Sequence, residues 1–484
     1  MNNYVCYHLH TMDSLLDSCT SYKDYIDYAV ELGQKAIGFS EHGNIYNWVS
    51  KWAYCKEKGI KYIHGIEIYL TETLEEKIRD NYHTILIAKN KEGFKELNTL
   101  YFLSTRPDHV YYKPRLTFDE FLNISDNIIK ISACIQSPLY KMYKDIREKM
   151  DYGIPQENRQ EKFIQLLNHY DYYEIQYHNM NNQIEYNQWL YEWSQIYNKP
   201  LIAATDTHSL NSYKAECRTI LQYGKTDGVW GDEENECDLT YKSYNELIKA
   251  FEIQNSLPVD VIAQAIENTN IMTDSVEELD FDTKDKYPVL YGDKDEEMLW
   301  KTLKIKYQEK VDRGEIDGNN PQYWKNINEE MAVFKKIDMI GFMLFMSRLI
   351  SWVKDNNIAV GFARGSCSGS TVAYISDITD VDPIKWHTIF SRFANENRVE
   401  IGDIDVDFFE DDRPKIYEHI INEFGKDKTA YILAVGTLAN KAAIDVIGKA
   451  FRVKTNNETE YTLDKIKEIK KEYETNPELT KKKY

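Results

Sequence analysis

YHLHTMDSLLD, at residues 7–17, joins a strand-like start to a cluster of residue types that bind metal ions. The residue pattern over Val5–His8 predicts a β-strand. His8 and His10 are two residues apart, so both imidazoles project from the same face of such a strand. Asp17 follows in the next predicted loop. The stretch therefore predicts a strand that brings metal-binding side chains to its carboxyl end.

Outward from this stretch, the first half of the chain alternates short apolar runs with helical stretches. Ala36–Ser40 and Leu201–Ala204 are two of the strand-like runs. Tyr22–Leu32 and Trp48–Lys58 have helical spacing, and each is followed by a glycine. This alternation predicts parallel strands with helices packed outside them, in a barrel or an open α/β sheet that continues to about residue 225.

Further metal-binding residue types fall at or near the ends of the predicted strands. The carboxyl ends of strands in an α/β barrel converge on one rim, where active sites form. Glu67 and His83 are less well placed on this strand map than the others. Five of the 11 histidines belong to the set, which makes the set more informative than any single member. Its nine members are His8, His10, Asp17, His42, Glu67, His83, Cys134, Asp206 and His208.

The mixture of imidazole, carboxylate and thiolate in this set suits Zn²⁺ or Mn²⁺ better than Mg²⁺. Several such ions close together activate water and hold a phosphoryl group, which is the chemistry of a hydrolytic phosphoesterase. A lone His or Cys at a strand end is more often structural than a ligand. The prediction of a metal site therefore depends on the whole set.

A second constellation begins with GFARGSCSGS at residues 361–370. Small residues let backbone N–H groups approach a phosphate closely, and the helix predicted at Thr371–Ile375 adds a favourable dipole. Arg364 supplies a planar fork for phosphate oxygens. By itself such a loop is a weak signal, because most Gly/Ser loops are simple turns.

The sequence GDIDVDF follows at residues 402–408. Asp403, Asp405 and Asp407 alternate along a predicted strand, so their carboxylates share one face and repel unless cations neutralise them. Two Asp residues at this spacing can hold two Mg²⁺ ions, which activate a 3′-hydroxyl and bind a triphosphate. An exposed acidic edge strand is the alternative. A phosphate loop followed within about 40 residues by Asp-x-Asp favours a nucleotide site.

Composition limits the other possibilities. The net charge of −20 argues against a passive coat for nucleic acid, but metal sites themselves need carboxylates. The seven cysteines contain no CxxC pair, which indicates reduced thiols and a cytoplasmic protein. No apolar run approaches the roughly 18–20 residues of a membrane span, and the start lacks a signal pattern, so no membrane partner is expected.

Four segments of the first half resemble motifs of the polymerase-and-histidinol-phosphatase (PHP) family, in the form that opens bacterial replicative polymerases. They are YHLHTMDSLLD at 7–17, SEHGN at 40–44, GIEIY at 65–69 and TDTH at 205–208. The resemblance implies a distorted (β/α)7 barrel that binds up to three metal ions through nine residues, and all nine types are present. It also implies a 3′–5′ exonuclease that could proofread. Glu41 stands where the family usually has Asp.

Segments 337–350, 357–370, 377–384 and 390–408 resemble, in order and spacing, the polymerase III α subunits of the bacterial C family. Their palm is similar to the nucleotidyltransferase fold of polymerase β. The resemblance implies a DNA-directed DNA polymerase with Mg²⁺ in the palm, primer–template DNA and dNTPs as partners, Asp403 and Asp405 as catalytic metal ligands, and triphosphate contacts from Arg364, Gly365, Ser366 and Ser370.

In that family the third catalytic carboxylate lies beyond the point corresponding to residue 484. We therefore expect an incomplete palm and little polymerisation by the isolated chain. Either a second polypeptide completes the polymerase, as a split gene would require, or the chain is a fragment of a longer protein. The predicted domains are a PHP phosphoesterase at 1–225, a connecting region at 226–295 and a partial palm at 296–484.

Two alternatives stay open at this point: a stand-alone PHP phosphoesterase or nuclease, and a non-catalytic scaffold of the replication complex. The loop and the Asp residues of the second constellation separate the polymerase from the stand-alone enzyme. An intact set of nine ligand types disfavours the scaffold.

Overall fold

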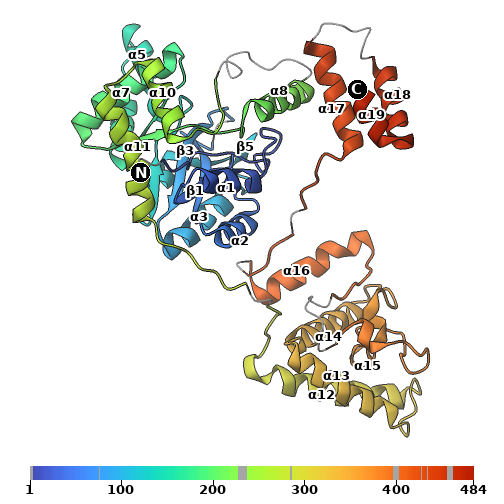
Figure 1. The fold of residues 1–484 in the computed structure, drawn as a ribbon. Helices are drawn as coiled ribbons and strands as arrows, with labels where there is room; N and C mark the ends of the chain where they lie inside the picture. The colour runs from blue at the N-terminus through green and yellow to red at the C-terminus, as the bar shows by residue number, and fades with distance from the viewer. Residues whose placement is uncertain are drawn as a thin grey trace. The chain divides into compact units, whose positions relative to one another are not determined.

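The chain forms two compact units in the computed structural model, which describes residues 4–75, 77–226, 237–283, 286–395, 403–426, 428–432, 434–454 and 462–483. Unit 1 comprises residues 1–280 and 436–484, and unit 2 comprises residues 281–435. Figure 1 shows the elements of each unit. The predicted connecting region includes residues 227–236 and 284–285, which lie outside the described residues. The boundaries expected at residues 225 and 295 stay predictions.

Unit 1 contains a mixed sheet with the strand order β4-β5-β2-β3-β6, and β1 also pairs with β2. β1 and β5 run parallel to β2, whereas β3 is antiparallel to both β2 and β6. β7 and β8 form a separate parallel pair. The strands are β1 (Ala36–Phe39), β2 (Lys61–Thr71), β3 (Tyr82–Ala88), β4 (Val110–Tyr111), β5 (Lys113–Thr117), β6 (Ile128–Ile131), β7 (Tyr173–Gln176) and β8 (Leu201–Ala204).

The prediction of parallel strands, in a barrel or an open α/β sheet, is confirmed in part, because β1 and β5 are parallel to β2 and β7 is parallel to β8. β3 is antiparallel to both of its neighbours, and a continuous ladder around a barrel is not seen in the described residues. Only isolated bridges join Ile131 to Tyr172 and Leu9 to Thr207. The strand expected at Val5–His8 is not formed either, because this segment meets its neighbours through single backbone bonds, such as that from Gly38 N to the Cys6 carbonyl (2.8 Å).

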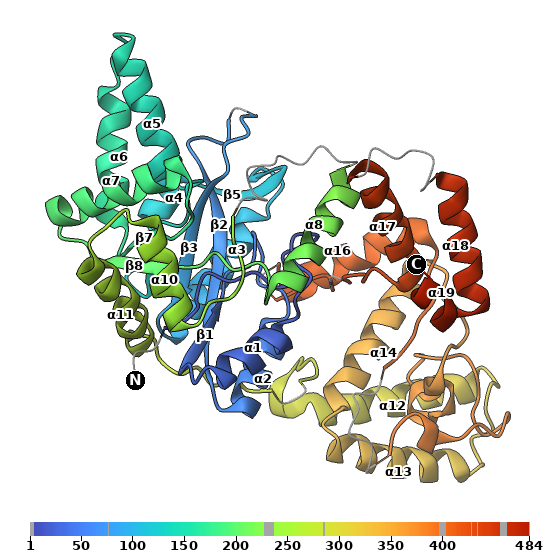
Figure 2. The same cartoon turned by 45° about the horizontal axis from the view of Figure 1, so that its top comes forward.

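Helices surround the sheets of unit 1, with α1 and α2 on one side and α5 to α7 on another (Figure 2). Apolar residues of the strands, such as Ile63, Ile85 and Ile131, form a core with Met272 of α11. The helices of this part are α1 (Tyr22–Glu31), α2 (Trp48–Lys58), α3 (Lys91–Ser104), α4 (Phe118–Leu122), α5 (Pro138–Asp151), α6 (Glu157–His169), α7 (Asn181–Tyr197), α8 (Ser212–Thr226), α10 (Tyr244–Gln254) and α11 (Val259–Ser275).

Three further helices belong to unit 1 although they come last in the chain: α17 (Asn440–Lys454), α18 (Leu463–Thr475) and α19 (Pro477–Lys483). α17 packs against α8 at Gly224. A Cβ at Gly224 would lie 2.6 Å from the Val446 carbonyl oxygen. The close approach of the two helices therefore requires glycine at this position.

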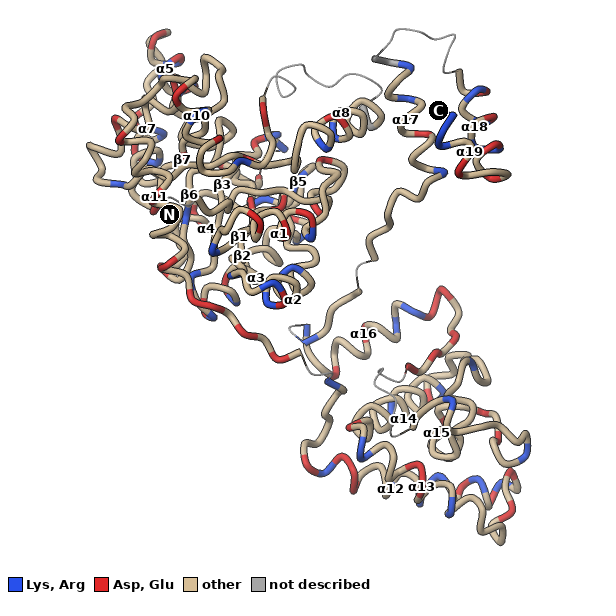
Figure 3. Tube along the Cα trace, viewed as in Figure 1, with Lys and Arg blue, Asp and Glu red and all other residues tan. Residues whose placement is uncertain are grey.

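Unit 2 is helical, and its core joins α12, α13, α14 and α15 through residues such as Leu303, Phe334, Met343 and Tyr374. Acidic and basic residues are interspersed along the helices of both units (Figure 3). Within the described part of the chain, no helix is both long enough and apolar enough to span a membrane. The helices are α12 (Asp295–Asp312), α13 (Gln322–Lys336), α14 (Ile340–Asp355), α15 (Thr371–Ile375) and α16 (Arg413–Phe424), with short 3₁₀ turns η1 (Gly292–Lys294), η2 (Ser366–Gly369), η3 (Phe390–Arg392) and η4 (Glu410–Asp412).

The strand expected over the Asp residues of unit 2 is not formed in the described residues. One antiparallel bridge, between Val360 and Phe408, is the pairing that this segment makes. The alternation itself is present. Ile404 and Val406 pack against the helical core, while the Asp residues that alternate with them, at positions 403, 405 and 407, are exposed. A nucleotidyltransferase sheet is therefore not seen in the described residues, since residues 403–407 form no strand ladder and make one backbone-to-backbone hydrogen bond, from Gly361 N to the Asp407 carbonyl (3.0 Å).

Asp377 of unit 2 provides a test of local stability. Its carboxylate lies 2.8 Å from Lys310 Nζ and 3.0 Å from Lys306 Nζ, and Lys310 is 3% exposed. Burial alone would raise the pKa of Asp377, but the two lysines outweigh it and lower the pKa. We expect Asp377→Asn to lower the free energy of unfolding by about 2 kcal/mol, because it leaves the buried Lys310 with Glu315, at 3.2 Å, as its one carboxylate partner in the described residues.

Urea unfolding of the full chain, followed by hydrogen exchange in α12 and α15, measures this effect. Because the folded-state pKa of Asp377 is lowered, the stabilisation is present above the unfolded-state pKa and is lost as pH falls through the folded-state value. Asp380→Asn is the control, since Asp380 and Lys354 are each 34% exposed and should contribute less than about 1 kcal/mol. Equal effects of the two variants would contradict the assignment.

Candidate metal centre

The strand directions in the mixed sheet explain why Glu67 and His83 lie with the other predicted ligands, at the edge of the sheet where β1 and β6 end, which we call the rim. β2 has 11 residues and continues past the end of β1, so Glu67 pairs with His42 in the loop that follows β1. β3 is antiparallel to β2, and His83 near its start pairs with Tyr69. The amino end of β3 therefore meets the carboxyl ends of its neighbours, and this places His83 among the other predicted ligands.

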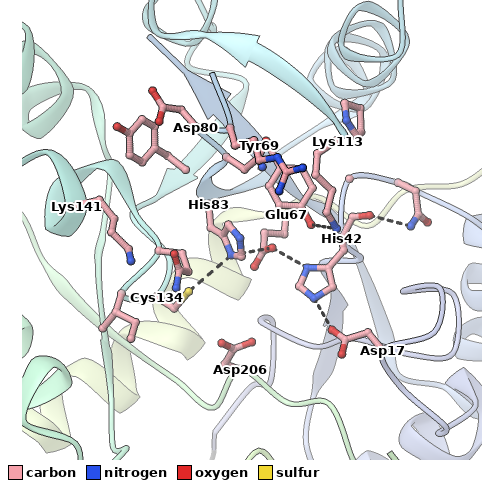
Figure 4. A pocket seen from close by; sticks show the side chains of 18 of the residues that line it. Asp17, His42, Glu67, Tyr69, Asp80, His83, Lys113, Cys134, Lys141 and Asp206 are labelled. Carbon is pink, nitrogen blue, oxygen red and sulfur yellow. Dashed lines mark hydrogen bonds and ion pairs between the residues drawn. The ribbon is translucent and has the colours of Figure 1, made fainter. Parts of the chain in front are cut away.

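One chain of contacts runs across this rim (Figure 4). His83 Nδ1 lies 3.7 Å from Cys134 Sγ and 3.1 Å from Glu67 Oε1. The same carboxylate oxygen lies 2.7 Å from His42 Nδ1, and His42 Nε2 lies 2.9 Å from Asp17 Oδ2. Five residue positions from separate segments are thus joined through shared oxygen and nitrogen atoms.

The remaining predicted ligands adjoin this chain. His8 Nε2 lies 3.1 Å from Asp206 Oδ1 and 3.2 Å from Glu67 Oε2. His10 Nε2 lies 3.5 Å from the same Asp206 oxygen. Possible ligand atoms lie within 4.8 Å of one another in two groups, one of His8, His10 and Asp206, and one of His10, His42 and His208.

A cavity of about 1400 Å³ opens over these residues. Its walls include seven of the nine predicted ligands, and His8 and His10 lie behind them, fully buried. The structure therefore brings all nine residues to one place, while their role as ligands stays a prediction. The seven are Asp17, His42, Glu67, His83, Cys134, Asp206 and His208.

Two buried polar atoms at this site test whether the residues suit a metal ion. His10 Nε2 and Asp206 Oδ1 are both buried, and neither forms a hydrogen bond in the described structure, although Asp206 Oδ1 lies in an ion pair with His8 Nε2. An unsatisfied buried polar group costs about 1–3 kcal/mol, so such atoms call for a ligand. An imidazole nitrogen and a carboxylate oxygen are both ligands of Zn²⁺ and Mn²⁺. The cluster therefore fits a bound cation.

The electrostatics of the site agree with this reading. Burial lowers the pKa of His10 to about 3, with further lowering by His42 and His208. Burial also disfavours a charged His42, but Glu67 and Asp17 outweigh it and raise the pKa of His42 to about 10. Burial raises the pKa of the Cys134 thiol well above its usual value. Cations would replace the proton on His42 and would favour the Cys134 thiolate.

Glu174 is a site residue that our sequence analysis missed. It is fully buried on β7, and one carboxylate oxygen lies 2.8 Å from His8 Nδ1 while the other accepts from the Tyr7 hydroxyl (2.9 Å). A carboxylate on the outer nitrogen fixes the tautomer and ring orientation of a metal-binding imidazole. The sequence offered one signal for Glu174. Glu174 and Gln176 are polar residues two positions apart on an apolar strand of the predicted barrel, so both side chains project from the same face.

Glu41 and Arg218 are two further polar residues that hydrogen-bond to side chains at or next to the rim. Glu41, where the resembled family usually has Asp, accepts hydrogen bonds from Ser14 Oγ (2.6 Å) and Lys51 Nζ (2.7 Å). Its longer side chain is therefore accommodated in a buried network. Arg218 of α8 donates to Asp17 Oδ1 (2.8 Å), which fixes the Asp17 carboxylate whose other oxygen faces His42.

In unit 2 the Gly/Ser loop lies beside the Asp residues. Arg364 Nη1 forms an exposed ion pair with Asp407 Oδ1 at 2.8 Å. Gly365 has a φ of +69°, and a Cβ there would lie 3.1 Å from Asp405 Oδ2. Ser366 begins the turn η2, and Asp403 is exposed. The structure thus brings the loop close to the Asp segment, while the roles of these residues stay predictions.

Ser370 is placed differently from the other predicted loop residues. Its side chain is fully buried, and its hydroxyl donates to Glu330 Oε2 (2.7 Å) and accepts from Ala373 N (3.0 Å). Glu330 also accepts from the backbone N–H groups of Thr371 and Val372. Ser370 therefore caps α15 and anchors the loop, and its expected contact with a triphosphate stays a prediction.

Comparison with known proteins gives two family matches. A model described as "PHP domain" matches residues 7–178, and one described as "Bacterial DNA polymerase III alpha NTPase domain" matches residues 296–484. A solved structure of a protein from Bifidobacterium adolescentis aligns with 42% of this chain and 87% of its own, at 10% identity and a TM-score of 0.29, which is too low to bear on the fold.

Relatives of known name match almost the whole chain. The DNA polymerase III subunit alpha of Aquifex aeolicus is 33% identical over 468 residues, which cover 93% of this chain and 40% of that protein. The corresponding subunit of Borreliella burgdorferi is 30% identical over 484 residues, 95% of this chain and 40% of that protein. The chain spans about 40% of the length of these curated relatives.

Unit 1 is a mixed α/β domain of the PHP type, with a His/Asp cluster suited to metal ions. The chain belongs to the bacterial DNA polymerase III α family, and it corresponds to the amino-terminal portion, a PHP domain followed by the start of the polymerase NTPase domain.

The contact between Glu174 and His8 leads to a prediction about metal affinity. We expect Glu174→Ala to weaken Mn²⁺ binding by about 10–100-fold, because His8 loses the group that orients it. Glu174→Gln keeps an acceptor for His8 Nδ1 and should lose less. Titration against a competing chelator measures the affinity. Glu185→Ala, an exposed change on α7, is the control, and an unchanged affinity in Glu174→Ala would contradict the assignment.

Proposed function

We propose that unit 1 is a metal-dependent phosphoesterase that removes nucleotides from 3′ ends of DNA, as a 3′–5′ exonuclease. The observation that carries this proposal is the convergence of nine imidazole, carboxylate and thiol side chains on one cavity, where His10 Nε2 is buried without a hydrogen bond and Asp206 Oδ1 has only histidine ring nitrogens as its ion-pair neighbours in the described residues. Structural polar networks normally satisfy such atoms. Buried ring nitrogens and carboxylate oxygens that face one another without hydrogen bonds beside a cavity support a site built for ions.

The proposed cations are Zn²⁺ or Mn²⁺, held by the nine residues His8, His10, Asp17, His42, Glu67, His83, Cys134, Asp206 and His208. Such ions, when bound, make water a nucleophile near neutral pH and stabilise charge on a phosphoryl group. The chain contributes the orientation of these ligands. Glu174 fixes His8, Arg218 fixes Asp17, and Glu67 is placed between three imidazoles.

Unit 2, with its Gly/Ser loop, is proposed to contribute to template-directed nucleotidyl transfer. Asp403 and Asp405 would hold Mg²⁺, and Arg364, Gly365, Ser366 and Ser370 would bind the triphosphate of a dNTP. The match to the polymerase III α family and the closeness of Gly365 to Asp405 support this role. Primer–template DNA and a second polypeptide are the proposed macromolecular partners, and the cytoplasm is the proposed location.

The hydrolytic proposal predicts Mn²⁺-dependent shortening of a 5′-labelled single-stranded DNA by the pure full chain. Asp206→Asn should slow it by about 100-fold or more, since even residues outside the ligand set cost 10–100-fold. Glu72→Gln is a matched control in the same cavity, because Glu72 pairs with Arg159. Cleavage that is equal in Asp206→Asn and the wild type, or that needs no added metal, would defeat the proposal.

The nucleotidyl-transfer proposal predicts that Asp403→Asn weakens Mg²⁺-dependent binding of dATP by about tenfold or more, because one carboxylate ligand is lost. Calorimetric titration of the full chain measures the affinity. Asp407→Asn should retain binding, because Asp407 pairs with Arg364 and its loss frees the guanidinium. Unchanged binding in Asp403→Asn would favour a stand-alone phosphoesterase or a scaffold.

A further inference from the structure

His178 is a buried imidazole of unit 1 that belongs to none of the roles described above. It follows β7 and lines the same cavity as the predicted ligands. Its side chain is 6% exposed, and neither ring nitrogen forms a hydrogen bond in the described structure. A half-turn of the ring about the Cβ–Cγ bond exchanges nitrogen and carbon positions, so either edge can present an N–H to the cavity.

The main chain around His178 is held by hydrogen bonds, while its two ring nitrogens are left without hydrogen-bond partners. Gln254 Nε2 of α10 donates to the His178 carbonyl (2.7 Å) and to the Gln176 carbonyl (3.0 Å). Met180 N donates to the same His178 carbonyl at 3.0 Å. The position of the imidazole is therefore fixed by the fold, and its hydrogen-bonding capacity is left for another molecule.

His178 differs from the predicted metal ligands in its surroundings. The inner ring nitrogens of His8 and His10 face other ligands, while Nδ1 of His8 bonds Glu174 and Nδ1 of His10 lies 3.1 Å from Ser14 Oγ. His178 has no such outer partner and belongs to neither group of possible ligand atoms. A metal-binding imidazole almost always bonds through its second nitrogen. His178 is thus better suited to a substrate than to an ion.

The occupant that fits is an oxyanion of a phosphate ester. Burial lowers the pKa of His178 to about 4, so the ring is neutral at pH 7 and has one N–H to donate. A neutral ring also avoids repulsion by cations bound near Asp206, one of its electrostatic neighbours. Elsewhere the cavity is lined by Lys141, which is exposed and makes no ion pair in the described part of the chain, and by Lys113.

We propose that His178 is a substrate-binding residue that donates a hydrogen bond to a phosphoryl oxygen of the DNA end. This inference rests on the proposed phosphoesterase function and adds a contact outside the nine metal ligands. Because both ring nitrogens are buried without hydrogen bonds in the free protein, the polar atoms of the imidazole should cost stability there, and only its ring packing, as against Tyr177, should favour the fold. A polar group retained at the expense of stability is typical of a functional site.

Binding of inorganic phosphate to the Mn²⁺-loaded full chain, measured by calorimetry, tests the proposal. His178→Leu should keep the Mn²⁺ stoichiometry, melt at the same or a higher temperature, and bind phosphate about tenfold more weakly or worse. His178→Gln retains a donor and should lie within about threefold of the wild type. Both variants avoid the metal ligands, so the comparison reports on the anion alone.

His64 provides the matched control. It is also buried with its pKa lowered to about 4, but both nitrogens are partnered, one by the Tyr62 hydroxyl (2.8 Å) and one by Asn98 Oδ1 (3.2 Å). His64→Leu should lower the melting temperature and leave phosphate affinity unchanged. The proposal therefore predicts that His178→Leu weakens phosphate binding without lowering the melting temperature, whereas His64→Leu lowers the melting temperature without weakening phosphate binding.

Three results would overturn the proposal: unchanged phosphate affinity in His178→Leu, a lower Mn²⁺ stoichiometry that makes His178 a ligand, or a loss of melting temperature like that of His64→Leu. Failure of the proposed function is read separately, on the wild type. If the wild type binds Mn²⁺ and phosphate but cleaves no DNA, the exonuclease proposal is wrong. The comparison of phosphate affinities still decides whether His178 binds a phosphoryl oxygen.

Discussion

The burial of the Glu67 carboxylate among imidazoles is the interaction on which the site of unit 1 depends. Glu67 is 1% exposed and contacts His8, His42 and His83. A buried carboxylate is stable only when positive charge compensates it. Protons on His8 and His42, whose pKa values are raised, supply that charge in the metal-free chain. Divalent cations can supply it instead, so metal binding should release protons.

The backbone makes this burial possible through two departures from a regular parallel barrel. β2 extends beyond β1, and β3 runs antiparallel to β2, so Glu67 and His83 reach the same rim as residues that follow parallel strands. Outside the rim, Glu174, Arg218 and the Glu41–Lys51 pair hold the facing side chains. Orientation is thus built into the protein before any cation binds, which is the condition for an effective metal site.

The sequence predicted the members of this cluster better than the path of the chain around it. Residues that follow strands, such as His42 and Asp206, could be located because strand ends meet at one rim. The direction of β3 could not be predicted, since a short apolar run reads alike in both directions. In unit 2, the sequence predicted that the carboxylates around Asp405 share one face, and the segment does alternate between exposed Asp and packed apolar residues, but strand pairing depends on a neighbouring segment that periodicity does not reveal. Ser370 was predicted as a phosphate-loop residue, and its hydrogen bond to Glu330, 40 positions away, could not be predicted from the local sequence.

The central claim is that the rim of unit 1 is a cation site rather than a self-contained network of ion pairs. Crystals of the full chain soaked with Zn²⁺ and measured at the zinc absorption edge test it most directly. The account predicts an anomalous peak about 2.0–2.2 Å from Asp206 and from the inner ring nitrogens of His8 and His10. Peaks confined to the molecular surface, with His8 Nε2 still 3.1 Å from the Asp206 carboxylate, would contradict it.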